Sequence, residues 1–88
     1  MLIFNIPKEF IDKIIFSFGK KNQDVVLIEE LSELQKEITK SMRGKEDKNH
    51  IVEEMAHCII SIQMCMKTHE ITNEMIQNEI DKKIRKYG

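Results

Sequence analysis

The most constraining feature of this sequence is an apolar run from Met55 to Met66 inside a longer helical pattern. Nine of its twelve residues are apolar, and at helical spacing they cover almost the whole circumference. The run includes His57, Ser61 and Gln63 and is shorter than the roughly 20 residues needed to span a membrane. Because a helix that is apolar all round must be surrounded, the run predicts a helical bundle.

The composition also favours an all-α fold. One Pro and three Gly in 88 residues, with 33% charged and 6% aromatic residues, are typical of helical proteins with few tight turns. We expect residues 1–88 to form a single all-α domain. Its four helices are predicted between Pro7 and Gly19, from about Asp24 to Met42, from about Asn49 to Thr68, and from about Thr72 to the basic chain end.

The small size of the chain predicts self-association. A domain of 10.4 kDa buries only about 60–65% of the surface that its unfolded chain exposes. Three other short helices can hardly enclose the apolar run Met55–Met66. We therefore expect a second copy of the chain to complete the core, as a homodimer or a homotetramer.

The charge balance and the cysteines restrict the partners and the compartment. Fourteen Lys and Arg face fifteen Asp and Glu, which argues against a protein that binds nucleic acid or a membrane by bulk charge. Cys58 and Cys65 are seven residues apart on a helix, about 10 Å, which is too far for a disulfide. We expect buried thiols in a cytoplasmic protein with no membrane or nucleic-acid partner.

Two short acidic patterns are the candidate metal ligands. Glu30 and Glu33 form an E-x-x-E pattern, and Glu54 and His57 form an E-x-x-H pattern. Each pair lies on one helix face. At about 100° per residue, Glu30 and Glu54 lie about 60° from the apolar stripes of their helices, and Glu33 and His57 about 120°. If the two helices pack antiparallel, the four side chains converge on one side of the pair.

Such a cluster suggests phosphate chemistry. Crowded carboxylates repel one another unless a cation neutralises them. Oxygen-rich clusters suit Mg²⁺ or Mn²⁺, which also bind substrate phosphates. Near the chain end, Lys82, Lys83 and Arg85 could neutralise a polyphosphate, although cations also stabilise a helix C-terminus without any ligand.

These residues resemble a known family. The chain is similar to the MazG-like all-α nucleoside triphosphate pyrophosphohydrolases at Phe18-Gly19, Gln23, the run 28–34, and Glu54-Met55-Ala56-His57, with twenty residues between Glu33 and Glu54. The pattern of that family is E-x-x-E, a spacer, then E-x-x-D. The resemblance covers roughly residues 14–86.

The resemblance implies a four-helix protomer in an oligomeric bundle. It also implies Mg²⁺- or Mn²⁺-dependent hydrolysis of a nucleoside triphosphate between the α- and β-phosphates, giving a monophosphate and pyrophosphate. Glu30, Glu33, Glu54 and His57 would be the metal ligands, and a glutamate, Glu30 or Glu33, would act on the attacking water. The basic residues Lys82, Lys83 and Arg85 would contact the phosphates.

His57 departs from the family pattern, which has Asp at this position. Imidazole suits Mn²⁺, Fe or Zn²⁺ better than Mg²⁺. The residue could instead be a half-buried, hydrogen-bonded histidine with no metal. Two other functions stay open: a non-catalytic helical dimer that binds a nucleotide or another protein, and a di-metal carboxylate bundle in which symmetry supplies a second Glu54-x-x-His57 motif.

Overall fold

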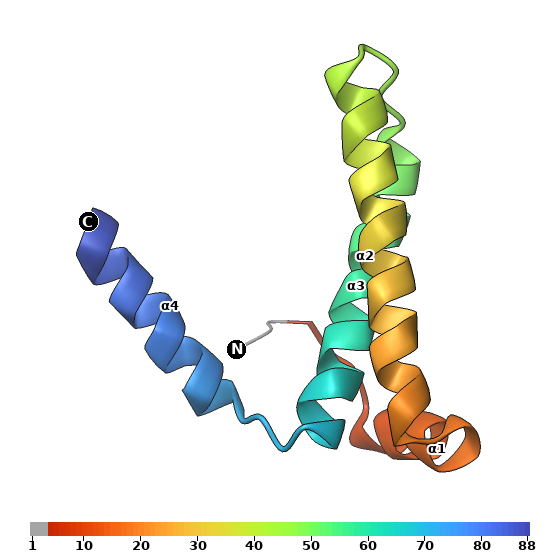
Figure 1. The fold of residues 1–88 in the computed structure, drawn as a ribbon, viewed down its shortest axis with the longest axis vertical. Coiled ribbons are helices and arrows are strands. Elements are labelled where there is room, and N and C mark those ends of the chain that lie inside the picture. The colour runs from red at the N-terminus through yellow and green to blue at the C-terminus, as the bar shows by residue number, and fades with distance from the viewer. Residues whose placement is uncertain (1–3) are drawn as a thin grey trace.

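The computed structural model describes residues 4–88 and is all-α (Figure 1). It contains four helices: α1 (Lys8–Phe18), α2 (Lys20–Met42), α3 (Lys48–Thr68) and α4 (Asn73–Tyr87). No strand occurs within residues 4–88. The predicted all-α class and the predicted number of helices are confirmed.

Helices α2 and α3 form a long antiparallel hairpin that is the body of the protein, and α1 lies across its open end (Figure 1). The loop that joins the two helices carries Asp47, whose side chain accepts a hydrogen bond from the His50 amide and begins α3. The core lies along the seam between α2 and α3. Its buried residues are Gln23, Glu37, Cys58, Ser61, Met64, Cys65 and Met66, together with Ile11 from α1.

The predicted start of α2 near Asp24 is wrong, because α2 already begins at Lys20. Gly19 alone separates it from α1, and its positive φ of 82° turns the chain within one residue. The buried Gln23 side chain donates to the Gly19 carbonyl at 2.9 Å and reinforces this turn. Asp24 is therefore not an N-cap, and its carboxylate is available to α3.

Helices α2 and α3 end in the same backbone motif but with different residues. In each, the second residue after the helix has positive φ, which is 79° at Gly44 and 56° at Glu70. The Ile71 amide then donates back to the Met66 carbonyl at 2.8 Å, and the equivalent bond closes α2 at 3.0 Å. Glycine adopts this conformation without strain, whereas a residue with a side chain does so at a cost.

This difference predicts opposite effects of two substitutions on stability. Glu70→Gly is expected to raise the free energy of unfolding by about 1 kcal/mol, because it removes the strain of a side chain at positive φ. Gly44→Ala is expected to lower it by about 1 kcal/mol, since no atom within 4 Å would oppose the new Cβ and only the backbone strain counts. Urea unfolding at one protein concentration measures both. A loss of stability in Glu70→Gly would contradict the prediction.

The apolar run on α3 is covered on one side only by the described part of its own chain. Cys58 and Cys65 are buried against α2, and both are free thiols, as predicted. On the outer face Val52 and Met55 are exposed. None of the helices within residues 4–88 combines the length and the apolar content that a membrane span requires.

Helix α4 stands apart from the rest of the described chain (Figure 1). It contacts none of the other three helices, and none of its residues is buried. Its start is well defined, because the Thr72 hydroxyl accepts a hydrogen bond from the Met75 amide at 3.2 Å. Helix α4 is therefore a regular helix that packs against no other helix of the described chain.

Candidate metal centre

The hairpin brings Glu30 on α2 beside Glu54 and His57 on α3. The Cys58 thiol donates to the Glu30 carbonyl at 3.3 Å, and this bond fixes the position of α3 along the axis of α2 at this point. His57 directly precedes Cys58, and Glu54 lies one turn earlier on the same face. The packing of one buried cysteine thus sets the positions of the three side chains.

The three side chains form a compact group. His57 Nδ1 lies 3.3 Å from Glu30 Oε2 and 3.8 Å from Glu54 Oε1. One ligand atom from each residue lies within 4.8 Å of the other two. Ligand atoms about 2.0–2.2 Å from one ion are at most about 4.4 Å apart, so small rotations of these side chains would let them share an ion.

The electrostatics of the group fit a cation. Glu54 Oε2 is buried and has no hydrogen-bond partner among the described residues. An unpaired buried carboxylate oxygen is costly unless a cation or a donor satisfies it. Burial raises the pKa of the Cys58 thiol, and the negative charges of Glu30 and Glu54 raise it further. The group is thus a site of negative potential with an unused ligand atom.

The donor set indicates which ions suit the site. Two carboxylates and one imidazole form a mixed oxygen and nitrogen set that suits Mn²⁺, Fe²⁺ or Zn²⁺ better than Mg²⁺. The side chains of Glu30, Glu54 and His57 are 24%, 17% and 42% exposed. The group is therefore open to solvent, and a bound ion could also take water or a phosphate as a ligand.

Of the four predicted ligands, three come together and Glu33 does not. Glu33 is exposed and is not part of the group formed by Glu30, Glu54 and His57. It lies one turn after Glu30 but farther round α2, where its side chain meets solvent.

Comparisons of the chain with protein-family models, with curated proteins and with solved structures found no match.

The predicted phosphate-binding residues Lys82, Lys83 and Arg85 all lie on α4. Lys82 Nζ is 2.8 Å from Glu79 Oε2, and this hydrogen bond raises the pKa of Lys82. Because α4 contacts no other helix of its chain, the three cations are not assembled with the acidic group within one protomer.

Glu37, a buried residue of α2, was not predicted from the sequence as part of a polar cluster. Glu37 is only 6% exposed and its Oε1 has no hydrogen-bond partner within the described part of the chain. Lys40 Nζ lies 3.3 Å from this oxygen and His50 Nδ1 lies 3.9 Å from it. The signal was available, because Glu37 follows Glu30 by seven residues, or two helical turns.

A second polar cluster, also missed, joins the start of α2 to the end of α3. His69 Nε2 lies 2.7 Å from Asp24 Oδ1, and the Cys65 thiol donates to the same oxygen at 3.5 Å. The hydrogen bond with His69 lowers the pKa of Asp24. Burial, followed by the hydrogen bond to Asp24, raises the pKa of Cys65 to about 11. Cys65 is thus a protonated structural thiol rather than a nucleophile.

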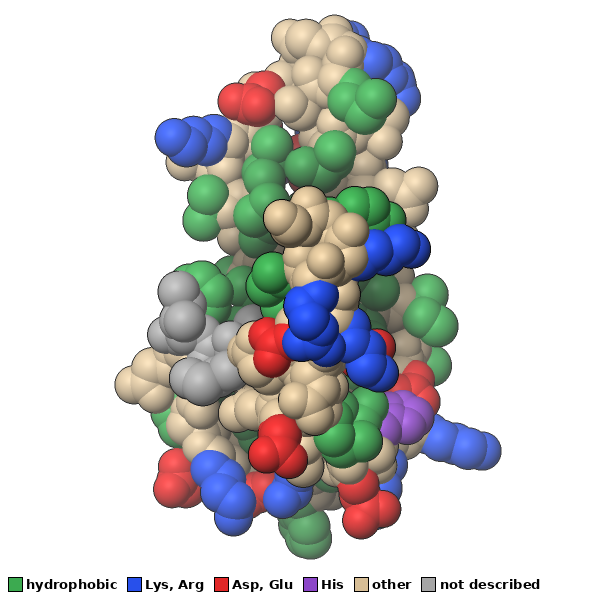
Figure 2. Space-filling view, turned by 90° about the vertical axis from the view of Figure 1, so that its left-hand side faces the viewer, with side chains coloured by type: hydrophobic (Ala, Val, Ile, Leu, Met, Phe, Trp, Pro, Cys, Tyr) green, Lys and Arg blue, Asp and Glu red, His purple; other side chains and the backbone are tan. Residues whose placement is uncertain are grey.

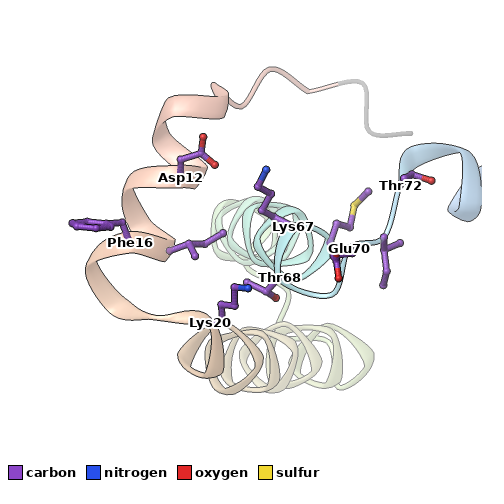
Figure 3. A pocket seen from close by; sticks show the side chains of 10 residues that line it. Asp12, Phe16, Lys20, Lys67, Thr68, Glu70 and Thr72 are labelled. Carbon is purple, nitrogen blue, oxygen red and sulfur yellow. The ribbon is translucent and has the colours of Figure 1, made fainter.

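An open pocket of about 780 Å³ lies at the same end of the hairpin (Figure 3). Asp12 and Phe16 come from α1, Lys20 from the start of α2, and Lys67 and Thr68 from the end of α3. Its charges are mixed, and no member of the Glu30, Glu54 and His57 group lines it. The pocket and the candidate metal centre are separate features.

Proposed function

We propose that this protein is a divalent-metal-dependent nucleoside triphosphate pyrophosphohydrolase that works as a homo-oligomer, a dimer or a tetramer. The observation that carries the proposal is the meeting of Glu30, Glu54 and His57, with ligand atoms within 4.8 Å of one another. They occupy three of the four positions of the MazG-like pattern, with His57 in place of the Asp of that pattern.

In this proposal Glu30, Glu54 and His57 hold the ion, which is Mn²⁺ or Mg²⁺. A bound divalent cation would neutralise phosphate oxygens and make the phosphorus atom more open to attack by water. Glu33 is exposed one turn from Glu30 and would orient the attacking water or accept its proton. Water adds to the nucleotide, the bond between the α- and β-phosphates breaks, and the products are a nucleoside monophosphate and pyrophosphate.

We assign Lys82, Lys83 and Arg85 to the phosphate tail of the substrate. Since α4 contacts no other helix of its own chain, this role requires assembly to bring α4 to a metal centre. We place the reaction in the cytoplasm, where the free thiols of Cys58 and Cys65 would stay reduced.

The test is a panel of ribo- and deoxyribonucleoside triphosphates incubated with the protein and Mg²⁺ or Mn²⁺, with pyrophosphate and monophosphate measured. We expect equal amounts of the two products, and none after addition of a chelator. Nucleotide binding that needs no metal and yields no pyrophosphate would support the non-catalytic function instead. Bound iron with a charge-transfer absorption band would support the di-metal bundle.

A further inference from the structure

Helix α4 carries an apolar stripe, and within residues 4–88 it packs against no other helix. Ile76, Ile80 and Ile84 follow one another at intervals of four residues and share one face. Ile80 is 41% exposed and Ile84 is 60% exposed. A helix of 15 residues is barely stable alone in water, so we expect another surface to cover this stripe.

The chain exposes more surface than a compact monomer of the same mass. Its accessible surface is 7124 Å², whereas a compact monomer of its mass exposes about 5,400 Å². Its radius of gyration is 14.9 Å, against about 12 Å for a compact domain of this length. The excess of roughly 1,700 Å² per chain would give two copies an interface within the range of obligate homodimers, which bury about 2,000–5,000 Å².

The outer face of α3 offers an apolar pocket of matching length. Residues between Val52 and Ile60 line it, together with Phe4 and Ile6 from the segment before α1, and its volume is about 400 Å³. Val52 and Ile60 are eight residues apart, as are Ile76 and Ile84, so both apolar stripes are about 12 Å long. Hydrophobic side chains are exposed across the side of the molecule that carries α4 (Figure 2).

We propose that α4 of one copy seats in this α3 pocket of a second copy, and that the exchange is reciprocal. The inference rests on the self-association in the proposed function and does not depend on hydrolysis. An isologous exchange of this kind gives each copy the same contacts and closes the assembly as a dimer.

The connection between α3 and α4 argues against α4 folding back onto its own chain. The amides of His69, Glu70 and Ile71 all donate to carbonyls in the last turns of α3, and Thr72 caps the start of α4. The linker therefore has few free torsions, and it directs α4 away from α3 (Figure 1). Packing against its own α3 would require a large change in the backbone torsions of this short linker.

The charges along both helices favour an antiparallel arrangement. Helix α3 has Lys67 in its last turn, and α4 has Glu74 in its first turn and Arg85 in its last. Antiparallel seating brings Lys67 to the end of α4 that carries Glu74, whereas parallel seating brings it to the end that carries Arg85.

The test compares Ile80→Glu with Asn78→Glu in the full chain by analytical ultracentrifugation. The wild-type mass is expected to be twice 10.4 kDa. Ile80→Glu should raise the dimer dissociation constant by at least about 30-fold, and Asn78→Glu, on the opposite face of α4, should leave it unchanged. Because α4 makes no contact with other helices of its chain, Ile80→Glu cannot act by unfolding the hairpin.

A disulfide experiment tests whether α4 binds in the α3 pocket of the second copy. Val52→Cys protein mixed with Ile84→Cys protein should form a disulfide between two chains on mild oxidation, while the buried Cys58 and Cys65 stay reduced. A dimer that Ile80→Glu does not weaken would overturn this interface and leave self-association intact. A monomeric wild type would overturn both. A disulfide within one chain of the double variant, at high dilution, would show that α4 docks on its own α3 and would overturn the exchange.

Discussion

Replacing Glu30 with Gln is expected to lower the metal-dependent release of pyrophosphate by at least about 100-fold. Changing a residue that only supports a metal ligand costs about 10–100-fold, and Glu30 is proposed as a ligand itself. Gln keeps the shape of the side chain but removes its charge, so the ion would lose one of its two carboxylates. His57 Nδ1, 3.3 Å from Glu30 Oε2, would also lose its anionic neighbour.

Glu29→Gln is the matched control for this variant. Glu29 is exposed on the adjacent position of α2 and is not part of the Glu30, Glu54 and His57 group, so its activity should equal that of the wild type. Mn²⁺ titration of both variants should show weaker metal binding in Glu30→Gln only. Full activity in Glu30→Gln, or an equal loss in both variants, would exclude Glu30 as a ligand.

The second large effect is expected at His57. Replacing His57 with Asp should raise turnover with Mg²⁺ about 10-fold relative to turnover with Mn²⁺, because a third carboxylate converts the mixed donor set into an all-oxygen one. The half-exposed side chain at this position leaves room for the exchange, so the hairpin should keep its stability.

His57→Asn is the control, because it has the size of Asp without the charge. His57→Asn should not raise turnover with Mg²⁺, and it should weaken the binding of Mn²⁺. The measurement is the rate of pyrophosphate release against the concentration of each metal. An unchanged ratio of Mg²⁺ to Mn²⁺ activity in His57→Asp would place residue 57 outside the ligand set.

Much of the fold could be predicted from the sequence, because breakers are few and the helices they separate are strongly periodic. The loop between α2 and α3 was recognised from Gly44 and the charged residues around it. The error at the start of α2 arose because Gly19 makes the whole turn by itself. A single residue at positive φ leaves no stretch of broken periodicity that would reveal how short the connection is.

The angular positions of the site residues around their helices could be predicted from the sequence, but their relative positions along the helix axes could not. The helical wheel placed Glu30, Glu33, Glu54 and His57 on one side of the hairpin; three of them meet there, and Glu33 does not. Whether residue 30 lies level with residue 57 depends on packing, here on the Cys58 thiol and the Glu30 carbonyl, which no periodicity reveals. The position of α4 was beyond prediction for a similar reason, since an apolar stripe shows that a face needs cover but not which surface covers it.

All three ligands of the candidate metal centre come from residues 30–57, within one hairpin, and α4 contributes none. Contacts between helices that are close in sequence form quickly, and a chain folds from its N-terminus as the ribosome extends it. The side chains of the candidate centre can therefore come together without any contact from α4. In the proposed function, capture of the ion would precede pairing with a second molecule.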